Sequence, residues 1–143
     1  MKTRQILLDT NFCLNPFRIG IDIFKEIRRI CSFNYQLLVP EEVARELLHL
    51  AQSNSKTGRY AKAALTLLEN KKVKLAKSKK VIKTSNLQHL DESRKNGDIA
   101  IIEYAKSHPD VIIATDDKLL RKRLSGFKFI FTRQKQYLVL EER

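Results

Sequence analysis

The chain has 143 residues, of which 43% are hydrophobic and 31% charged, a composition typical of a globular protein and not of a disordered one. Lys and Arg number 28 against 16 Asp and Glu, and the net charge of +12 favours a polyanionic partner, most often nucleic acid. No apolar run is long enough to span a bilayer and residues 1–9 lack the features of a signal peptide, so we expect a cytoplasmic protein without a membrane segment.

The length is common for one domain, and neither a Ser/Gly-rich linker nor a repeat divides the sequence. Residues 1–143 are therefore predicted to form a single domain. Cys13 and Cys31 are too few for a disulfide scaffold and too far apart for a zinc motif. We expect both to be reduced residues of the core, which agrees with a cytoplasmic location.

Strands and helices are predicted to alternate from the beginning of the chain. The apolar run at 6–8 stops at Asp9, as a central parallel strand would. A helix is predicted over 21–31 from the spacing of its apolar residues, and a strand over 37–39. Pro40 and two acids then open a helix over 41–51, because both suit the positive end of a helix dipole.

The alternation continues to the end of the chain. Only the polar stretch 84–95 is hard to assign, and we expect a loop with a short helical piece there. The pattern predicts an α/β fold with a mostly parallel sheet and helices on both faces. The remaining predicted elements are helices over 58–70, 98–107 and 117–124, and strands over 73–75, 111–114, 127–131 and 136–140.

Acidic residues follow two of these strands directly. Asp9 comes after the strand at 6–8, and Asp116 and Asp117 come after the strand at 111–114. In open parallel sheets, ligands bind beyond the carboxyl ends of the strands. These acids are therefore candidates for one functional site.

Two further acids are placed by the phase of their helices. At 100° per residue, Asp98 heads the apolar stripe of its helix, and a charge directed at a core needs a partner or a metal. Glu46 lies at the border of the apolar face of helix 41–51, whereas Glu42 and Glu41 lie further out. Glu46 is thus the acid of that helix best directed at the site.

Each acid also has a structural interpretation. Asp98, Asp116 and Asp117 suit the first position of a helix, Asp9 can cap a turn with its neighbours, and Glu46 can pair with a surface cation. Four acids directed at one edge of one sheet nevertheless arise by chance less often than a single acid in such a position.

Carboxylates held together repel one another, and a divalent cation removes the conflict. Oxygen ligands without His or Cys suit Mg²⁺ or Mn²⁺. Such ions polarise a phosphoryl oxygen and activate water, and a pair can stabilise both the attacking and the leaving oxygen of a phosphodiester. The acids therefore indicate phosphodiester hydrolysis.

Two basic runs complement an acidic pocket that alone would repel nucleic acid. Phosphate contacts supply affinity but little sequence information. The second run begins at the proposed site, and for both runs a solvated face is the structural alternative. The first run comprises Lys71, Lys72, Lys74, Lys77, Lys79, Lys80 and Lys83, and the second Lys118, Arg121, Lys122 and Arg123.

Four motifs in this order and spacing resemble those of the PIN-domain nucleases: LLDTN at 7–11, the run from Pro40 to Leu47, NGD at 96–98, and ATDDKLLR at 114–121. The resemblance covers nearly the whole chain. It implies a three-layer α/β/α sandwich, Mg²⁺ or Mn²⁺, and endonucleolytic cleavage of RNA.

The resemblance also implies roles for individual residues. Asp9, Glu46, Asp98 and Asp117 match the acids of the family. Asp9, Asp98, Asp117 and Asp116 are the implied metal ligands. Of these, Asp116 falls where the family often has Asn or Asp and can assist or share the fourth role. Asn11 and Thr115 match supporting polar residues.

Two branches of the family fit the sequence. One comprises VapC-like toxins, which often form homodimers and are inhibited by an antitoxin protein. The other processes ribosomal RNA within pre-ribosomal particles, and the stretch from Lys56 to Leu75 is more similar to that branch and to its archaeal VapC-type relatives.

Other functions agree less well with the sequence. A receiver domain needs an acidic pair near its first strand, and a haloacid-dehalogenase-type phosphatase needs Asp-x-Asp, which Asn11 interrupts. The stronger alternative is a protein of the same fold that binds RNA, or assists ribosome assembly, without cutting.

Overall fold

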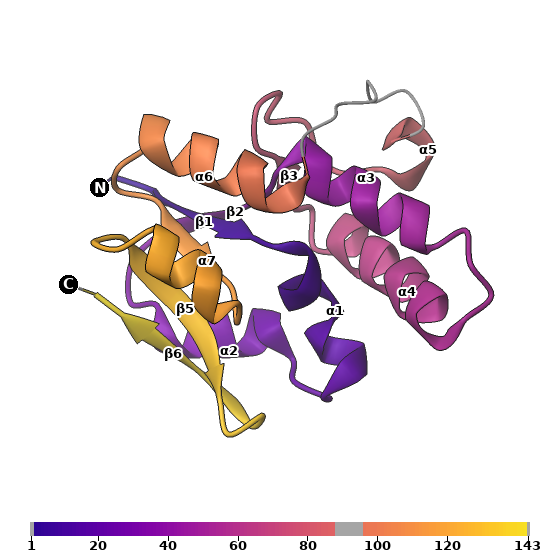
Figure 1. The fold of residues 1–143 in the computed structure, drawn as a ribbon, viewed down its shortest axis with the longest axis horizontal. Coiled ribbons are helices and arrows are strands. Elements are labelled where there is room, and N and C mark those ends of the chain that lie inside the picture. Colours follow the sequence, from indigo (N-terminus) through magenta and orange to yellow (C-terminus); the bar gives the residue numbers. More distant parts are fainter. Residues whose placement is uncertain (1, 88–95, 143) are drawn as a thin grey trace.

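The computed structural model describes residues 2–87 and 96–142 and contains one six-stranded sheet with the strand order β3-β2-β1-β4-β5-β6 (Figure 1). All neighbours are parallel except β6, which runs antiparallel to β5. The α/β prediction with a mostly parallel sheet is confirmed. The strands are β1 (Arg4–Leu8), β2 (Tyr35–Val39), β3 (Lys74–Leu75), β4 (Ile112–Ala114), β5 (Lys128–Arg133) and β6 (Tyr137–Glu141).

Helices cover both faces of the sheet. Right-handed crossovers that leave β1 and β4 in opposite directions place their helices on opposite faces. Accordingly, α7 lies in front of β5 in Figure 1, whereas α2 lies behind the β5–β6 pair. The described helices are α1 (Thr10–Arg18), α2 (Ile23–Ile30), α3 (Glu41–Leu50), α4 (Lys56–Asn70), α5 (Thr84–Leu87), α6 (Gly97–Ser107) and α7 (Lys118–Arg123).

The centre of the sheet creates the site. β1 lies between β2 and β4, and its residues Ile6, Leu7 and Leu8 are fully buried. The chain leaves β1 towards β2 and leaves β4 towards β5, so the carboxyl ends of β1 and β4 form a topological switch point. Residues that follow these two strands therefore face a common crevice.

Helix α1 was not among the predicted elements. Asn11, Asn15 and Pro16 are poor helix formers, and Pro16 also lacks the N–H that would bond one turn back. The helix forms nevertheless because Asp9 caps its first turn and because Phe12 and its neighbours are buried. Burial has outweighed local propensity here.

The prediction for Glu42 was wrong. This residue was expected to lie further from the apolar face than Glu46, but it is the more deeply buried of the two. Helix α6 lies over the first turn of α3, where Glu42 lines a cavity with Ala100 and Tyr104 of α6. Packing by α6 thus widens the buried face beyond what the periodicity of α3 indicates.

The other elements agree with the predictions to within two residues at each end. Helix α5 is the short helical piece expected in the stretch 84–95, and the rest of that stretch, residues 88–95, lies outside the described residues. Cys13 and Cys31 are buried free thiols, as expected. Within the described residues, no helix combines the length and apolarity that crossing a bilayer requires.

Candidate active site

Asp9 is the most deeply buried acid of the predicted set, with 5% of its surface exposed. It follows β1 directly, and its backbone N–H donates to the carbonyl of Ala114 on β4. One carboxylate oxygen accepts the backbone N–H of Phe12 at 2.7 Å, and the other accepts the hydroxyl of Thr115. The end of the central strand therefore fixes both oxygens of Asp9.

Thr115 connects Asp9 to the end of β4. It is fully buried, and its hydroxyl donates to Asp9 while accepting the backbone N–H of Asp117 at 3.1 Å. Asp117 in turn caps α7, because its Oδ1 accepts the N–H groups of Leu119 and Leu120. Since Asp117 is exposed and these bonds use one oxygen, Oδ2 remains available at the mouth of the site.

Asp116 is held differently from Asp117. Its Oδ2 accepts the side-chain amide of Asn15 at 2.9 Å, and its Oδ1 accepts the backbone N–H of Thr132 at 2.6 Å. Both oxygens are therefore engaged in fixing α1 and β5 to the end of β4. This arrangement favours Asp117 over Asp116 as the fourth acid.

Glu46 reaches the site from the middle of α3. Its Oε2 accepts the hydroxyl of Thr10 at 2.7 Å, and its Oε1 accepts the backbone N–H of Gly97 at 2.5 Å. A Cβ added at Gly97 would come within 3.1 Å of this carboxylate and 3.0 Å of Val43. Gly97 thus permits the close approach that joins α3 to the beginning of α6.

Asp98 completes the group from the first turn of α6. Burial raises its pKa, and repulsion by Asp117 and Glu46 raises it further, whereas Arg123 lowers it. Burial likewise raises the pKa of Asp9 to about 6; hydrogen bonds from Thr115 and Phe12 lower it, and repulsion by Asp116 and Asp98 raises it. The structure therefore brings all the predicted acids into one network of mutual repulsion.

This network is not neutralised by ion pairs among the described residues. The salt bridges found there join Lys2 to Asp110, Arg4 to Glu142 and Arg29 to Glu26, all outside the acid cluster. A partly buried set of oxygen donors without His or Cys suits a hard divalent cation. In residues 2–87 and 96–142, no three acidic, His or Cys side chains are grouped closely enough to hold one metal ion, so shared coordination requires side chains of the cluster to move.

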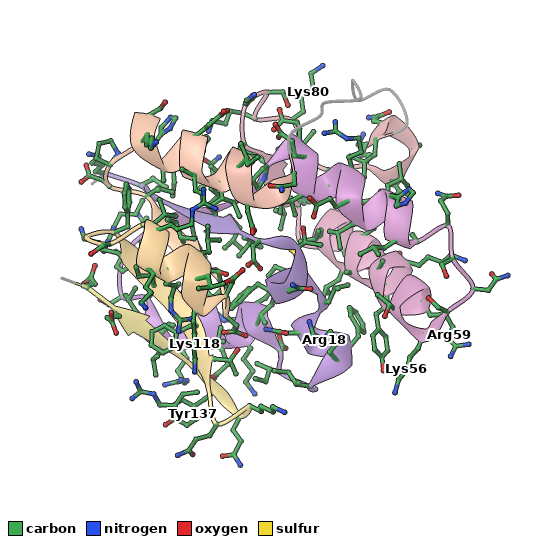
Figure 2. All side chains as sticks on the ribbon, in the orientation of Figure 1. Arg18, Lys56, Arg59, Lys80, Lys118 and Tyr137 are labelled. Atoms are coloured by element: carbon green, nitrogen blue, oxygen red, sulfur yellow. The ribbon has the colours of Figure 1, made fainter. Side chains whose placement is uncertain are left out.

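The remaining predicted residues lie around this cluster. Asn11 is exposed on α1, where it accepts a long bond from Arg18 rather than contacting an acid. Arg121 donates to the carbonyl of Thr115 and lies over the Phe131 ring, so it attaches α7 to the sheet. The other predicted cations, Lys118, Lys122 and Arg123, are exposed on α7, and Lys118 is labelled at its beginning (Figure 2).

Thr115 was predicted as a supporting residue, but two other residues that orient the acids were not predicted. Thr10 and Asn15 bond to Glu46 and Asp116 from α1, the helix that was not predicted. The signal for Asn15 was its place among apolar residues, since a buried amide needs a polar partner. Figure 2 also shows cations that were not singled out: Arg18 at the end of α1 and Lys56 and Arg59 at the beginning of α4.

Comparison with known proteins gives one family and several relatives. The PIN like domain family matches residues 6–135 of this chain. Ribonuclease VapC4 from Methanocaldococcus jannaschii is 30% identical over 135 residues, which cover 93% of each chain.

Solved structures with the same fold have lower sequence identity. The PIN domain endonuclease Utp24 aligns with a TM-score of 0.71 at 17% identity, over 97% of this chain and 92% of that chain. VapBC2 from Rickettsia felis, bound to a DNA fragment from its promoter, aligns with a TM-score of 0.57 at 14% identity, over 89% of this chain and 98% of that chain.

Proposed function

Because this chain belongs to the PIN-like domain family, we propose that it is a metal-dependent endoribonuclease that hydrolyses RNA phosphodiester bonds. The observation that carries the proposal is the network of carboxylates at the switch point of the sheet, around the buried Asp9. Glu46, Asp98 and Asp117 are the other proposed catalytic acids. The nuclease names of the aligned relatives support the same class of reaction.

The proposed cofactor is Mg²⁺ or Mn²⁺. Asp9, Asp98 and Asp117 would hold it, with Asp116 in an assisting position. When bound, such an ion supplies positive charge that stabilises the phosphoryl oxygens and promotes attack by water. Burial is the main cause of the raised pKa values of Asp9 and Asp98, and the ion would also relieve the repulsion between carboxylates that raises them further.

The protein's own residues keep the acids in place before substrate arrives. Thr115 fixes the orientation of Asp9, and Thr10 and the N–H of Gly97 fix Glu46. Fixed polar groups stabilise developing charge better than groups that must reorganise during the reaction. Asn11 has a supporting role in this proposal, on the exposed side of α1, the helix that also carries Thr10.

The exposed cations of α7 are the proposed contacts to the RNA backbone beside the acids. Lys118, Lys122 and Arg123 extend from the helix that Asp117 caps. Arg121 contributes by holding this helix against β5. Neutralising these side chains would weaken binding of RNA of any sequence, and the effect would decrease with salt.

Two biological roles agree with the relatives. In one, the protein is a VapC-like toxin, often dimeric, whose antitoxin partner is encoded nearby; in the other, it cleaves RNA within a pre-ribosomal particle. A small reading frame just upstream that encodes an antitoxin-like protein would favour the toxin. The buried free thiols Cys13 and Cys31 suit either role in a reducing cytoplasm.

The function is tested by cleavage of end-labelled RNAs after removal of metals with EDTA. We expect no cleavage in EDTA and recovery when excess Mn²⁺ or Mg²⁺ is added. Ca²⁺ is an informative comparison, because it binds oxygen ligands in a larger and more flexible geometry. Binding of diverse RNAs without cleavage under any of these ions would contradict the proposal and favour an RNA-binding protein.

Thr115→Val tests how the active-site acids are positioned. Valine keeps the shape of threonine but removes the hydroxyl that bonds to Asp9 and accepts the N–H of Asp117. Loss of a group that orients a metal ligand typically costs about 10–100-fold, and we expect kcat to fall by that factor with the RNA affinity unchanged.

Unfolding in urea provides the control for Thr115→Val. The variant should lose about 1 kcal/mol, because the N–H of Asp117 loses its acceptor. Thr132→Val is the matched variant for stability: the Thr132 hydroxyl is buried with no partner among the described residues, so its removal should cost nothing. Wild-type kcat in Thr115→Val would contradict the positioning role.

A further inference from the structure

A basic groove lies at the end of the sheet opposite the acids. It has a volume of about 620 Å³ and lies beside the amino ends of β1 and β2, bounded by α2 and the turn after α4. Its lining includes four cations and no acid: Arg28, Lys71, Lys72 and Lys74.

These four cations are not neutralised within the described part of the chain. The salt bridges found there all involve other residues. Burial raises the pKa of the Tyr35 hydroxyl, and the positive charge of nearby Arg28 lowers it. Lys71 Nζ lies 5.8 Å from the centre of the Phe24 ring. Like charges gathered around one hollow repel, and a polyanion that enters it relieves this repulsion.

The hollow exists because β3 covers only part of β2. β3 pairs with Leu38 and Val39, whereas residues 35–37 of β2 pair with β1 alone among the described residues. The chain reaches β3 through a turn in which Lys72 has φ of 56°. This turn carries the lysines along the open edge of β2 instead of filling it.

We propose that this groove is a second RNA-binding surface, which contacts the phosphate backbone of the substrate far from the cleaved bond. The five residues of β1, Arg4–Leu8, place the groove and the acids about 17 Å apart, at about 3.3 Å per residue. A short single-stranded RNA bound at the acids does not reach the groove at the opposite end of the sheet. The preferred substrate is therefore a long or folded RNA. The identity of the polyanion rests on the proposed function.

Binding measurements in EDTA test this inference without requiring cleavage. The variant combines Arg28→Gln, Lys71→Gln and Lys74→Gln and leaves Lys72, whose left-handed backbone a substitution would disturb. For a long stem-loop RNA we expect at least about 10-fold weaker binding and a salt-dependence slope lower by about 2 to 3, at about 0.7–0.9 per lost phosphate contact. Binding of a short oligouridine should not change.

The matched control removes the same amount of charge elsewhere. Arg59→Gln, Lys62→Gln and Lys106→Gln neutralise three exposed cations outside the groove and should change stem-loop binding less than twofold. Equal losses in both triple variants would show a nonspecific effect of net charge and overturn the proposal. Polyglutamate is the probe for an acidic peptide. If the groove variant binds the stem-loop as the wild type does but no longer binds polyglutamate, the groove is a peptide site and the proposal is overturned. Failure of cleavage in the wild type contradicts only the proposed function.

Discussion

Asp9→Asn is expected to lower RNA cleavage by about 1,000-fold or more, which corresponds to about 4 kcal/mol of activation free energy. Asparagine keeps the size of aspartate and can still accept the N–H of Phe12, so the cap of α1 is retained. What disappears is the negative charge at the centre of the carboxylate network. Steady-state cleavage of labelled RNA with excess Mn²⁺ measures the effect.

The same substitution should stabilise the metal-free protein at neutral pH. Burial raises the pKa of Asp9 from 3.8 to about 6, so the folded protein binds a proton in a window where the unfolded chain has lost it. Wild-type stability therefore falls as pH rises from about 4 to about 6, by about 3 kcal/mol in total, and stays reduced above that window. Asparagine does not titrate, so the variant avoids this loss.

Urea unfolding in EDTA measures this difference as a function of pH. The free energy of unfolding of Asp9→Asn minus that of the wild type should rise between pH 4 and pH 6 and then remain constant. Adding Mn²⁺ should stabilise the wild type but not the variant, since a ligand that binds the folded state at 100 times its Kd contributes about 2.7 kcal/mol.

Asp110→Asn is the control for Asp9→Asn. Asp110 is exposed and pairs with Lys2 on the surface, so its loss removes the same formal charge without touching the site. We expect wild-type cleavage, pH dependence and response to Mn²⁺. If Asp9→Asn retains activity, or if Mn²⁺ stabilises it as much as the wild type, the carboxylate network does not bind the metal.

Gly58→Ala is expected to have the largest effect on stability among the glycine variants. A Cβ at Gly58 would overlap the carbonyl oxygen of Ser53 and lie 3.0 Å from that of Leu50. These oxygens belong to the backbone of the turn after α3 and of the last residue of α3, so the connection between α3 and α4 must shift. We expect a loss of about 2–4 kcal/mol, which lowers Tm by roughly 10 °C in a domain of this size.

Gly126→Ala separates steric overlap from backbone strain. Gly126 has φ of 94° but open space where a Cβ would lie, so alanine there costs about 1 kcal/mol from its unfavourable backbone conformation alone. Thermal unfolding of the two variants in parallel gives the comparison. Equal destabilisation would mean that the α3–α4 turn adapts easily and that the close approach at Gly58 is not a constraint.

The sequence alone determined that acids lie at the ends of strands and at the beginnings of helices. The apolar run of β1 stops at Asp9, that of β4 stops before Asp116 and Asp117, and Asp98 opens α6. Such local patterns are visible because periodicity and caps depend on residues close together in the chain. They sufficed to predict a mostly parallel sheet with the acids at its carboxyl edge.

Only the tertiary structure decided how these acids are held. Glu46 is fixed by Thr10 and Gly97, and Asp116 by Asn15 and Thr132, through pairs separated by 16 to 101 residues in the chain. Likewise, α1 forms despite Pro16 because its apolar side chains are buried. Contacts between distant segments leave no periodic signal in the sequence, since they depend on which elements pack together.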